Sequence, residues 1–258
     1  MNTEQAISVE SLSKDFLSRG NRLPVLNQID FHAEHGEFVT IVGPSGCGKS
    51  TLMNIMAGLE TQSSGDVLLQ GEVSDNRLGR VGYMHQKDLL LPWRSVIDNA
   101  VLGLEVLGSG GARAKEKAQH LMDLFGLAGF ENEDPHALSV GMRQRAAFLR
   151  TVLTDQDVFL LDEPFGSLDA LSRSKMQEWL LSLWESMNKT IVLVTHDVDE
   201  AIFLSDRVYV MSPRPGCMRL VESVDLPRPR RFEMITSSDF VALKKRLLDS
   251  IREEAISK

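Results

Sequence analysis

Cysteine is scarce in this chain, and its two cysteines, Cys47 and Cys217, fit neither a disulfide framework nor the ligand spacing of a zinc site. The beginning of the chain lacks the basic and then apolar layout of a signal peptide. No apolar run approaches the ~18 residues that are needed to span a bilayer. These absences predict a protein of a reducing, cytoplasmic compartment whose connection to a membrane passes through another protein.

Positive charge is also in short supply, because 28 Lys and Arg stand against 36 Asp and Glu, for a formal net charge of -8. A nucleic-acid-binding protein usually carries a basic surface, so this balance argues against nucleic acid as a partner, although it does not exclude a segregated basic face. The 258 residues are enough for one sizeable domain or two small lobes, and 43% hydrophobic residues are ordinary for a globular protein.

The spacing of apolar residues predicts an α/β fold. Strands are expected at residues 6–12, 28–32, 37–42, 80–85, 158–161, 190–194 and 207–211. Helical spacing is present at residues 49–58, 96–107, 115–127, 174–184 and 198–203, with a glycine-rich break at 108–111. Strands that alternate with helices in this way are typical of a parallel sheet.

The last part of the chain differs from the rest. Residues 226–231 form a linker rich in Pro and Arg, and Phe240, Leu243, Leu247, Leu248 and Ile251 then recur at helical spacing. This apolar stripe favours a helix that packs onto the domain over one that binds a partner. We therefore expect one domain at residues 1–225, with a helical part at about 88–155, followed by a linker and an amphipathic helix at 226–258.

A glycine-rich loop lies between the strand expected at 37–42 and the helix expected at 49–58. It reads Gly43-Pro44-Ser45-Gly46-Cys47-Gly48-Lys49-Ser50-Thr51 and fits the phosphate-loop pattern G-x4-G-K-[ST]. Its backbone N–H groups must approach phosphate oxygens closely, which requires glycine, and the following helix aims its positive end at the same anion. In such a loop Lys49 bridges the β- and γ-phosphates and the Ser50 hydroxyl ligates Mg²⁺. The loop therefore predicts ATP binding, and a plain glycine turn is the alternative.

A second apolar strand ends in two acids, Asp162 and Glu163. A buried strand that ends in this way can place carboxylates beside a nucleotide phosphate. We expect Asp162 to hold Mg²⁺, through water or Ser50, and Glu163 to polarise the attacking water as general base. A solvent-exposed charge pair is the alternative, and it would be favoured if the chain had no phosphate loop.

Three further features are ordinary when each is taken alone. Residues 138–145 (LSVGMRQR) open a helix, Gln86 follows a short strand, and His196 closes the strand that ends at Thr195. Together with the phosphate loop and the acidic pair, in this order, they resemble the ATP-binding subunit of an ABC transporter over about residues 8–229. The resemblance implies a phosphate-loop NTPase core with a mostly parallel sheet, an N-terminal antiparallel β subdomain and a helical subdomain.

The resemblance also implies how the site is assembled. In that family the signature motif binds the γ-phosphate of ATP held by the opposite subunit, here through the Ser139 hydroxyl and the Gly141 amide. Gln86 is implied to contact Mg²⁺ and the attacking water, and His196 to contact the γ-phosphate. Residues 167–169 resemble the loop that communicates across the dimer.

The sequence allows two roles for Phe16, and it departs from the family at Val140. Phe16 stands where the family often places an aromatic ring against adenine, but alternation along its strand also allows Phe16 to be core. Val140 is a departure, because the family usually has glycine there, and a β-branched residue disfavours positive φ.

Residues 87–93 and 211–216 look like the corresponding stretches of importers of nitrate, sulfonates, taurine and thiamine-pyrimidine precursors. The implied partners are a second copy in a head-to-tail, ATP-bridged dimer, transmembrane permease subunits, and indirectly an extracytoplasmic substrate-binding protein. The permease is expected near Gln86 and residues 89–93, where Trp93 belongs either to this interface or to the core of the helical lobe. Such a subunit lies at the cytoplasmic face of the inner membrane.

A soluble non-transport ABC ATPase, a small-molecule kinase and an exporter subunit are the rival classes.

Overall fold

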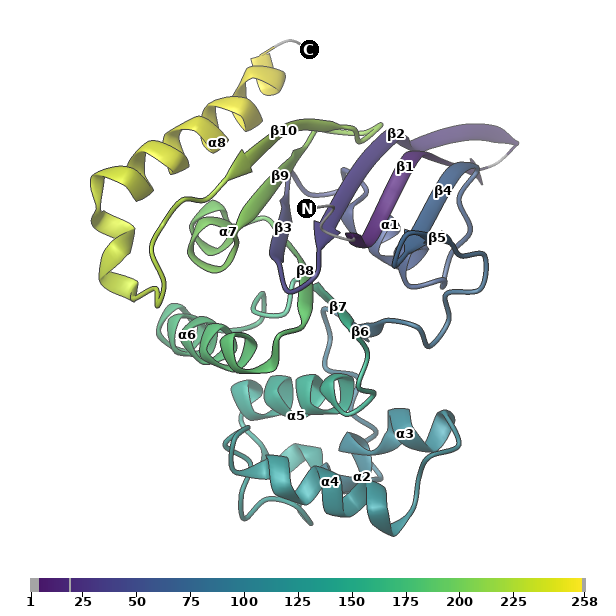
Figure 1. Cartoon of the computed structure of the whole chain (residues 1–258), viewed down its shortest axis with the longest axis vertical. Coiled ribbons are helices and arrows are strands. Elements are labelled where there is room, and N and C mark those ends of the chain that lie inside the picture. Colours follow the sequence, from purple (N-terminus) through teal and green to yellow (C-terminus); the bar gives the residue numbers. More distant parts are fainter. Residues whose placement is uncertain (1–4, 19, 257–258) are drawn as a thin grey trace. The chain divides into compact units, whose positions relative to one another are not determined.

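The computed structural model describes residues 5–18 and 20–256, which fall into two compact units (Figure 1). The first unit comprises the chain up to Leu78 and from Gln177 onward, and the second comprises Gly79–Met176. The first four residues of the stretch tested for a signal peptide lie outside the described residues. Within the described part of the chain, no helix combines the length and the low polarity needed to cross a membrane.

The first unit contains an antiparallel sheet. Its strands are β1 (Gln5–Ser18), β2 (Asn21–Glu34), β4 (Ser64–Leu69) and β5 (Glu72–Val73), in the order β2-β1-β4-β5. Ile7 and Val9 are buried on β1, and Leu12 is buried beyond the register shift that lies between Val9 and Leu12. This sheet confirms the expected N-terminal antiparallel subdomain.

The first unit also contains parallel strands. β3 (Phe38–Val42) pairs in parallel with β8 (Thr190–Thr195) and with β9 (Arg207–Met211), and β10 (Met218–Ser223) is added antiparallel to β9. Every residue of β3 and β8 is buried, which explains their largely apolar sequences, FVTIV and TIVLVT, since parallel strands are covered on both faces. Helix α1 (Lys49–Met56) follows β3, and α7 (Val198–Leu204) follows β8 and packs on β3.

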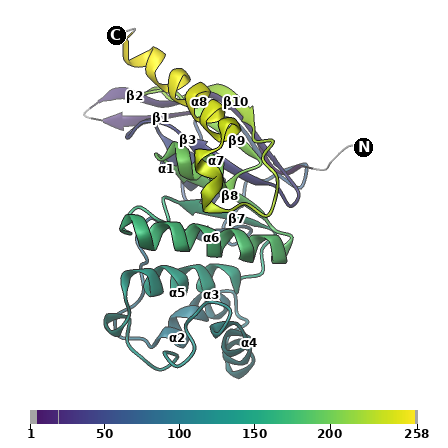
Figure 2. The same ribbon diagram turned by 90° about the vertical axis from the view of Figure 1, so that its left-hand side faces the viewer.

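The C-terminal helix α8 (Ser238–Ile256) follows a short 3₁₀ turn, η2 (Phe232–Thr236), and belongs to the first unit. Its residues Phe240, Leu243 and Leu247 are buried, and the helix packs against α7, β9 and β10 (Figure 2). The apolar stripe predicted from the sequence is therefore a packing face.

The Pro/Arg linker before α8 is anchored to the first unit. The buried guanidinium of Arg230 donates hydrogen bonds to the carbonyl oxygens of Ile202, Phe203 and Ser205 at 3.0, 3.1 and 2.6 Å. Arg228 lies 4.3 Å from the ring centroid of Trp184 and forms an ion pair with Asp206 at 2.6 Å. Both arginines therefore fix the path of the linker.

The second unit combines two parallel strands with helices. Strand β6 (Gly82–Met84) pairs with β7 (Val158–Asp162). The helices are α2 (Val96–Ala100), α3 (Leu102–Val106), α4 (Ala112–Met122), the 3₁₀ turn η1 (Pro135–Ala137), α5 (Val140–Val152) and the first part of α6 (Ala170–Met187). The single helix predicted at 96–107 is thus two short helices, and the one predicted at 115–127 begins and ends earlier.

Candidate nucleotide site

The loop between β3 and α1 has the backbone geometry that phosphate binding needs. Gly48 precedes α1 with φ of 113°, and a Cβ there would lie 2.6 Å from Leu26 Cδ2. Gly46 also has a positive φ of 79°, but nothing lies within 4 Å of its Cβ position. No side-chain oxygen caps the beginning of α1, where the first N–H groups of a helix have no acceptor within the helix. These groups and the positive helix end fit an anion such as phosphate.

Lys49 places its positive charge against this loop. The side chain is buried, and its ammonium donates to the carbonyl oxygens of Gly43 at 2.8 Å and Pro44 at 3.0 Å. The Cys47 thiol is buried beside it, and this burial raises the pKa of Cys47 above its usual value. Cys47 is therefore a neutral neighbour of the cation at neutral pH. Ser50 and Thr51 follow in the first turn of α1.

His196 and the phosphate loop leave neighbouring strands at the same edge of the sheet. In the parallel register of β3 and β8, Val42 lies opposite Thr195. Gly43 and His196 are the next residues of each strand, so both follow the carboxyl ends of paired strands, where ligands bind in open α/β sheets. His196 is exposed there.

Phe16 lies on β1 with its ring half-buried. The Lys14 ammonium lies 4.7 Å from the ring centroid and is held by Glu60 Oε1 at 2.7 Å and the Thr61 carbonyl oxygen at 2.6 Å. Phe16 is therefore not a core residue, and the alternative that alternation left open is wrong. A partly exposed ring of this kind can stack on a base.

In the second unit, the structure brings Gln86 and Glu163 together. The Gln86 Nε2 donates to Glu163 Oε2 at 3.2 Å. Asp162 ends β7 and is buried, so the alternative of a solvent-exposed charge pair is wrong for this residue. Glu163 has a φ of 44°, a left-handed conformation that costs a non-glycine residue about 1–2 kcal/mol. Such strain is common at functional positions.

Helix α5 begins within the signature stretch. Ser139 is its N-cap and accepts a hydrogen bond from the Met142 N–H at 3.3 Å, so the Ser139 O–H can still donate. Nothing lies within 4 Å of the Cβ position at Gly141, so the packing of the second unit does not require glycine there. Val140 is the first residue of the helix and is not among the residues with positive φ. The valine therefore fits its backbone conformation without strain.

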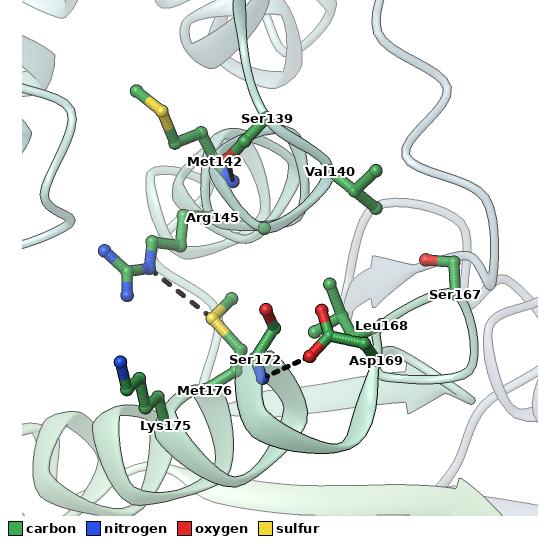
Figure 3. A pocket seen from close by; sticks show the side chains of 11 residues that line it. Ser139, Val140, Met142, Arg145, Ser167, Leu168, Asp169, Ser172, Lys175 and Met176 are labelled. Atoms are coloured by element: carbon green, nitrogen blue, oxygen red, sulfur yellow. Dashed lines mark hydrogen bonds between the residues drawn. The ribbon is translucent and has the colours of Figure 1, made fainter.

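The signature stretch and residues 167–169 line one cavity of about 380 Å³ in the second unit (Figure 3). Hydrogen bonds from Ser172 lower the pKa of Asp169, which also accepts from the Leu171 N–H at the beginning of α6. The cations Arg145 and Lys175 line the same cavity and point to the same side of it in Figure 3. The sequence predicted the two stretches separately, whereas the side chains of Ser172 and Lys175 were missed because nothing in their spacing marks them.

The predicted site residues are divided between the units. Phe16, the phosphate loop and His196 belong to the first unit, and Gln86, Ser139, Gly141, Asp162 and Glu163 belong to the second.

A parallel strand, a phosphate loop with its lysine, and a second strand that ends in carboxylates define a phosphate-loop nucleotide-binding protein. The model of the ABC transporter family matches residues 26–166, more than half of the chain, and the chain belongs to this family. It is an ATPase whose hydrolysis of ATP is coupled to transport.

Similar proteins cover nearly the whole chain. An uncharacterized ABC transporter ATP-binding protein of Methanocaldococcus jannaschii is 41% identical over 97% of this chain and 92% of its own length. The aliphatic sulfonates import ATP-binding protein SsuB of Bacillus cereus is 41% identical over 94% of each chain. Among solved structures, a dimeric post-hydrolysis state of the ATP-binding cassette MJ0796 bound to ADP and Pi has a TM-score of 0.75 and 26% identity, over 86% of this chain and 100% of that chain.

The valine of the signature stretch gives a first testable prediction. Replacing Val140 with glycine should leave ATPase activity within a few-fold of the unchanged protein, because Val140 already has a helical conformation and its side chain is 39% exposed. Glycine in the first turn of a helix is expected to lower stability by no more than about 1 kcal/mol. Steady-state phosphate release, measured beside thermal unfolding, tests this. Loss of activity without loss of stability would show that the valine is a specific adaptation.

Proposed function

We propose that the chain powers the import of a small nutrient of the nitrate, sulfonate, taurine or thiamine-precursor class, with an aliphatic sulfonate as the first candidate. The observation that carries this proposal is the 41% identity, over 94% of both chains, to the aliphatic sulfonates import ATP-binding protein of Bacillus cereus. The similarity of residues 87–93 and 211–216 to importers of this group supports the same class.

In the proposed reaction, the amides of the phosphate loop and Lys49 bind the phosphates of ATP, and the Phe16 ring stacks on the adenine. Ser50, Asp162 and Gln86 would hold Mg²⁺, which would neutralise phosphate charge when it is bound. Glu163 accepts the proton of the attacking water. The Gln86 amide already donates a hydrogen bond to Glu163, and it thereby orients the carboxylate toward that water. His196 donates to the γ-phosphate. Carboxylate, hydroxyl and amide oxygens are the donors that Mg²⁺ prefers, so these residues fit the ion.

The site is proposed to be completed by a second copy. Ser139 and the Gly141 amide would bind the γ-phosphate of ATP held by the other subunit, and the cavity beside them, together with the positive end of the 13-residue helix α5, supports this role. The solved relative that is dimeric and bound to ADP and Pi supports the same assembly. ATP would then bridge two copies, and hydrolysis would remove the bridge.

We propose that permease subunits dock on the segment after Gln86. Leu89 and Trp93 are 51% and 75% exposed there, so the alternative that Trp93 is core is wrong. Arg150 donates to the carbonyl oxygens of Asp88 at 2.6 Å and Leu89 at 2.9 Å, which fixes the backbone that presents these side chains. Large exposed apolar side chains on a fixed segment are typical of interfaces. The chain would thereby sit at the cytoplasmic face of the membrane and serve an extracytoplasmic binding protein indirectly.

The experiment for the substrate class is a growth and uptake test. A strain that lacks this gene should fail to grow on an alkanesulfonate as sole sulfur source, and the unchanged gene should restore growth whereas Glu163→Gln should not. Growth on sulfate is the control. A defect with nitrate or taurine alone would reassign the substrate within the group, and the absence of any uptake defect with these compounds would overturn the proposed substrate class.

A further inference from the structure

Tyr83 lies on the strand beside the one that ends in Asp162. In the parallel register of β6 and β7, Tyr83 is opposite Leu160. Side chains alternate along a strand, so Asp162, two residues beyond Leu160, is on the same face as Tyr83. The Tyr83 hydroxyl is hydrogen-bonded to the Asp162 side chain. A phenol from one strand therefore contacts the carboxylate at the end of the next.

The chemistry of the two groups fixes the direction of the hydrogen bond. A phenol has an O–H that can donate, whereas a carboxylate anion can only accept, so the Tyr83 hydroxyl donates to Asp162.

The position of Tyr83 is fixed by its neighbours. A Cβ at Gly82 would lie 2.3 Å from the ring of Phe159, so only glycine lets β6 approach β7 this closely. The ring of His85 packs against the ring of Tyr83, with 4.4 Å between centroids and an interplanar angle of 55°. The hydroxyl is thus presented to Asp162 by a ring that is itself held in place.

We propose that Tyr83 is a positioning residue that holds the Asp162 carboxylate in the orientation in which it serves Mg²⁺. The proposal rests on the metal role proposed for Asp162. A phenol that holds one carboxylate oxygen removes the freedom of that side chain before the ion arrives. The other carboxylate oxygen can still accept the ion or an ion-bound water. Tyr83 acts through Asp162 and needs no contact with the nucleotide.

The test is Tyr83→Phe, which removes the hydroxyl and keeps the ring against His85. We expect the concentration of Mn²⁺ that half-saturates the protein with a non-hydrolysable ATP analogue to rise by about tenfold, measured by electron paramagnetic resonance of free Mn²⁺. Binding of the same analogue in the presence of EDTA should not change. An unaltered Mn²⁺ dependence in Tyr83→Phe overturns the proposal.

A matched control uses the other tyrosine of the chain. The Tyr209 hydroxyl, in the first unit, donates to the His32 carbonyl oxygen at 3.1 Å, and His32 is not among the residues proposed for the metal site. Tyr209→Phe should therefore leave the Mn²⁺ dependence unchanged. An equal effect of both variants would assign the loss to general loosening and would also overturn the proposal.

A double-mutant cycle separates this proposal from the metal role of Asp162. Asp162→Asn should weaken Mn²⁺ binding by itself, and Tyr83→Phe should add little to it, because both act through one carboxylate. Additive losses would show that Tyr83 acts elsewhere. No effect of Asp162→Asn would instead remove the proposed metal role, and with it the basis for Tyr83.

Discussion

Replacement of Glu163 by glutamine is expected to reduce ATP turnover by about 10²–10⁴-fold while ATP remains tightly bound. Glutamine keeps the size of the side chain but cannot accept the proton of the attacking water. Its amide carbonyl can still accept the hydrogen bond from Gln86 Nε2, which is 3.2 Å from Glu163 Oε2 in the unchanged protein. Because the γ-phosphate would no longer be removed, two copies should stay joined by ATP. Phosphate release and size-exclusion chromatography with ATP and Mg²⁺ measure the two effects.

The control for this variant is Glu178→Gln, which makes the same chemical change on an exposed position of α6. It should leave turnover and the monomer–dimer balance unchanged. If Glu163→Gln turned over ATP at a nearly normal rate, another group would be the base. Turnover lost together with ATP binding would point instead to a disturbed fold around the left-handed backbone of Glu163.

The elements around the phosphate loop could be predicted from the sequence because their signals are local. Phe38–Val42 is a short, mostly apolar strand, and the glycines that follow it are needed where the backbone has positive φ or meets Leu26. The helix after the loop was also expected, but it ends at Met56, two residues early. Local chemistry therefore defined this strand, loop and helix almost completely.

Three strands could not be recognised, because their support comes from pairing. β10 is half-exposed along its whole length, and it exists because it adds to the edge strand β9. β4 and β5 are likewise short, β5 is exposed and β4 only partly buried, and they extend the sheet that β1 begins. β1 itself continues to Ser18, six residues beyond the predicted end, because its pairing with β2 continues through register shifts. Alternation alone carries none of this information.

The candidate site was predicted as separate motifs, and the structure adds which of them meet. The hydrogen bond between Gln86 and Glu163 joins residues 77 positions apart, and no spacing rule could give it. The cavity shared by Ser139, Gly141 and Asp169 depends in the same way on how α5 and the beginning of α6 are placed. Tyr83 was missed for a different reason, since its strand was recognised but its register with β7 was not available from the sequence.

Replacement of Lys49 by alanine is expected to weaken ATP binding by about a hundredfold or more. Each charge-assisted hydrogen bond contributes about 1.5–3 kcal/mol, and about 1.4 kcal/mol corresponds to a factor of ten in affinity. The buried ammonium already lies 2.8 Å from the Gly43 carbonyl oxygen and 3.0 Å from that of Pro44, so little reorganisation separates it from a phosphate at this loop. Isothermal titration calorimetry with ATP measures the loss.

Two further variants decide whether the loss comes from charge or from shape. Lys49→Arg keeps the charge but brings a planar, longer group into a loop where a Cβ at Gly43 would already lie 2.7 Å from the Met211 carbonyl oxygen, so it should not restore binding. Lys244→Ala removes a charge from a half-exposed ion pair between α8 and Asp199 of α7 and should bind ATP normally. Tight ATP binding by Lys49→Ala would contradict the assignment. It would mean that the backbone amides of the loop and the positive end of α1 suffice to hold the phosphates without the ammonium.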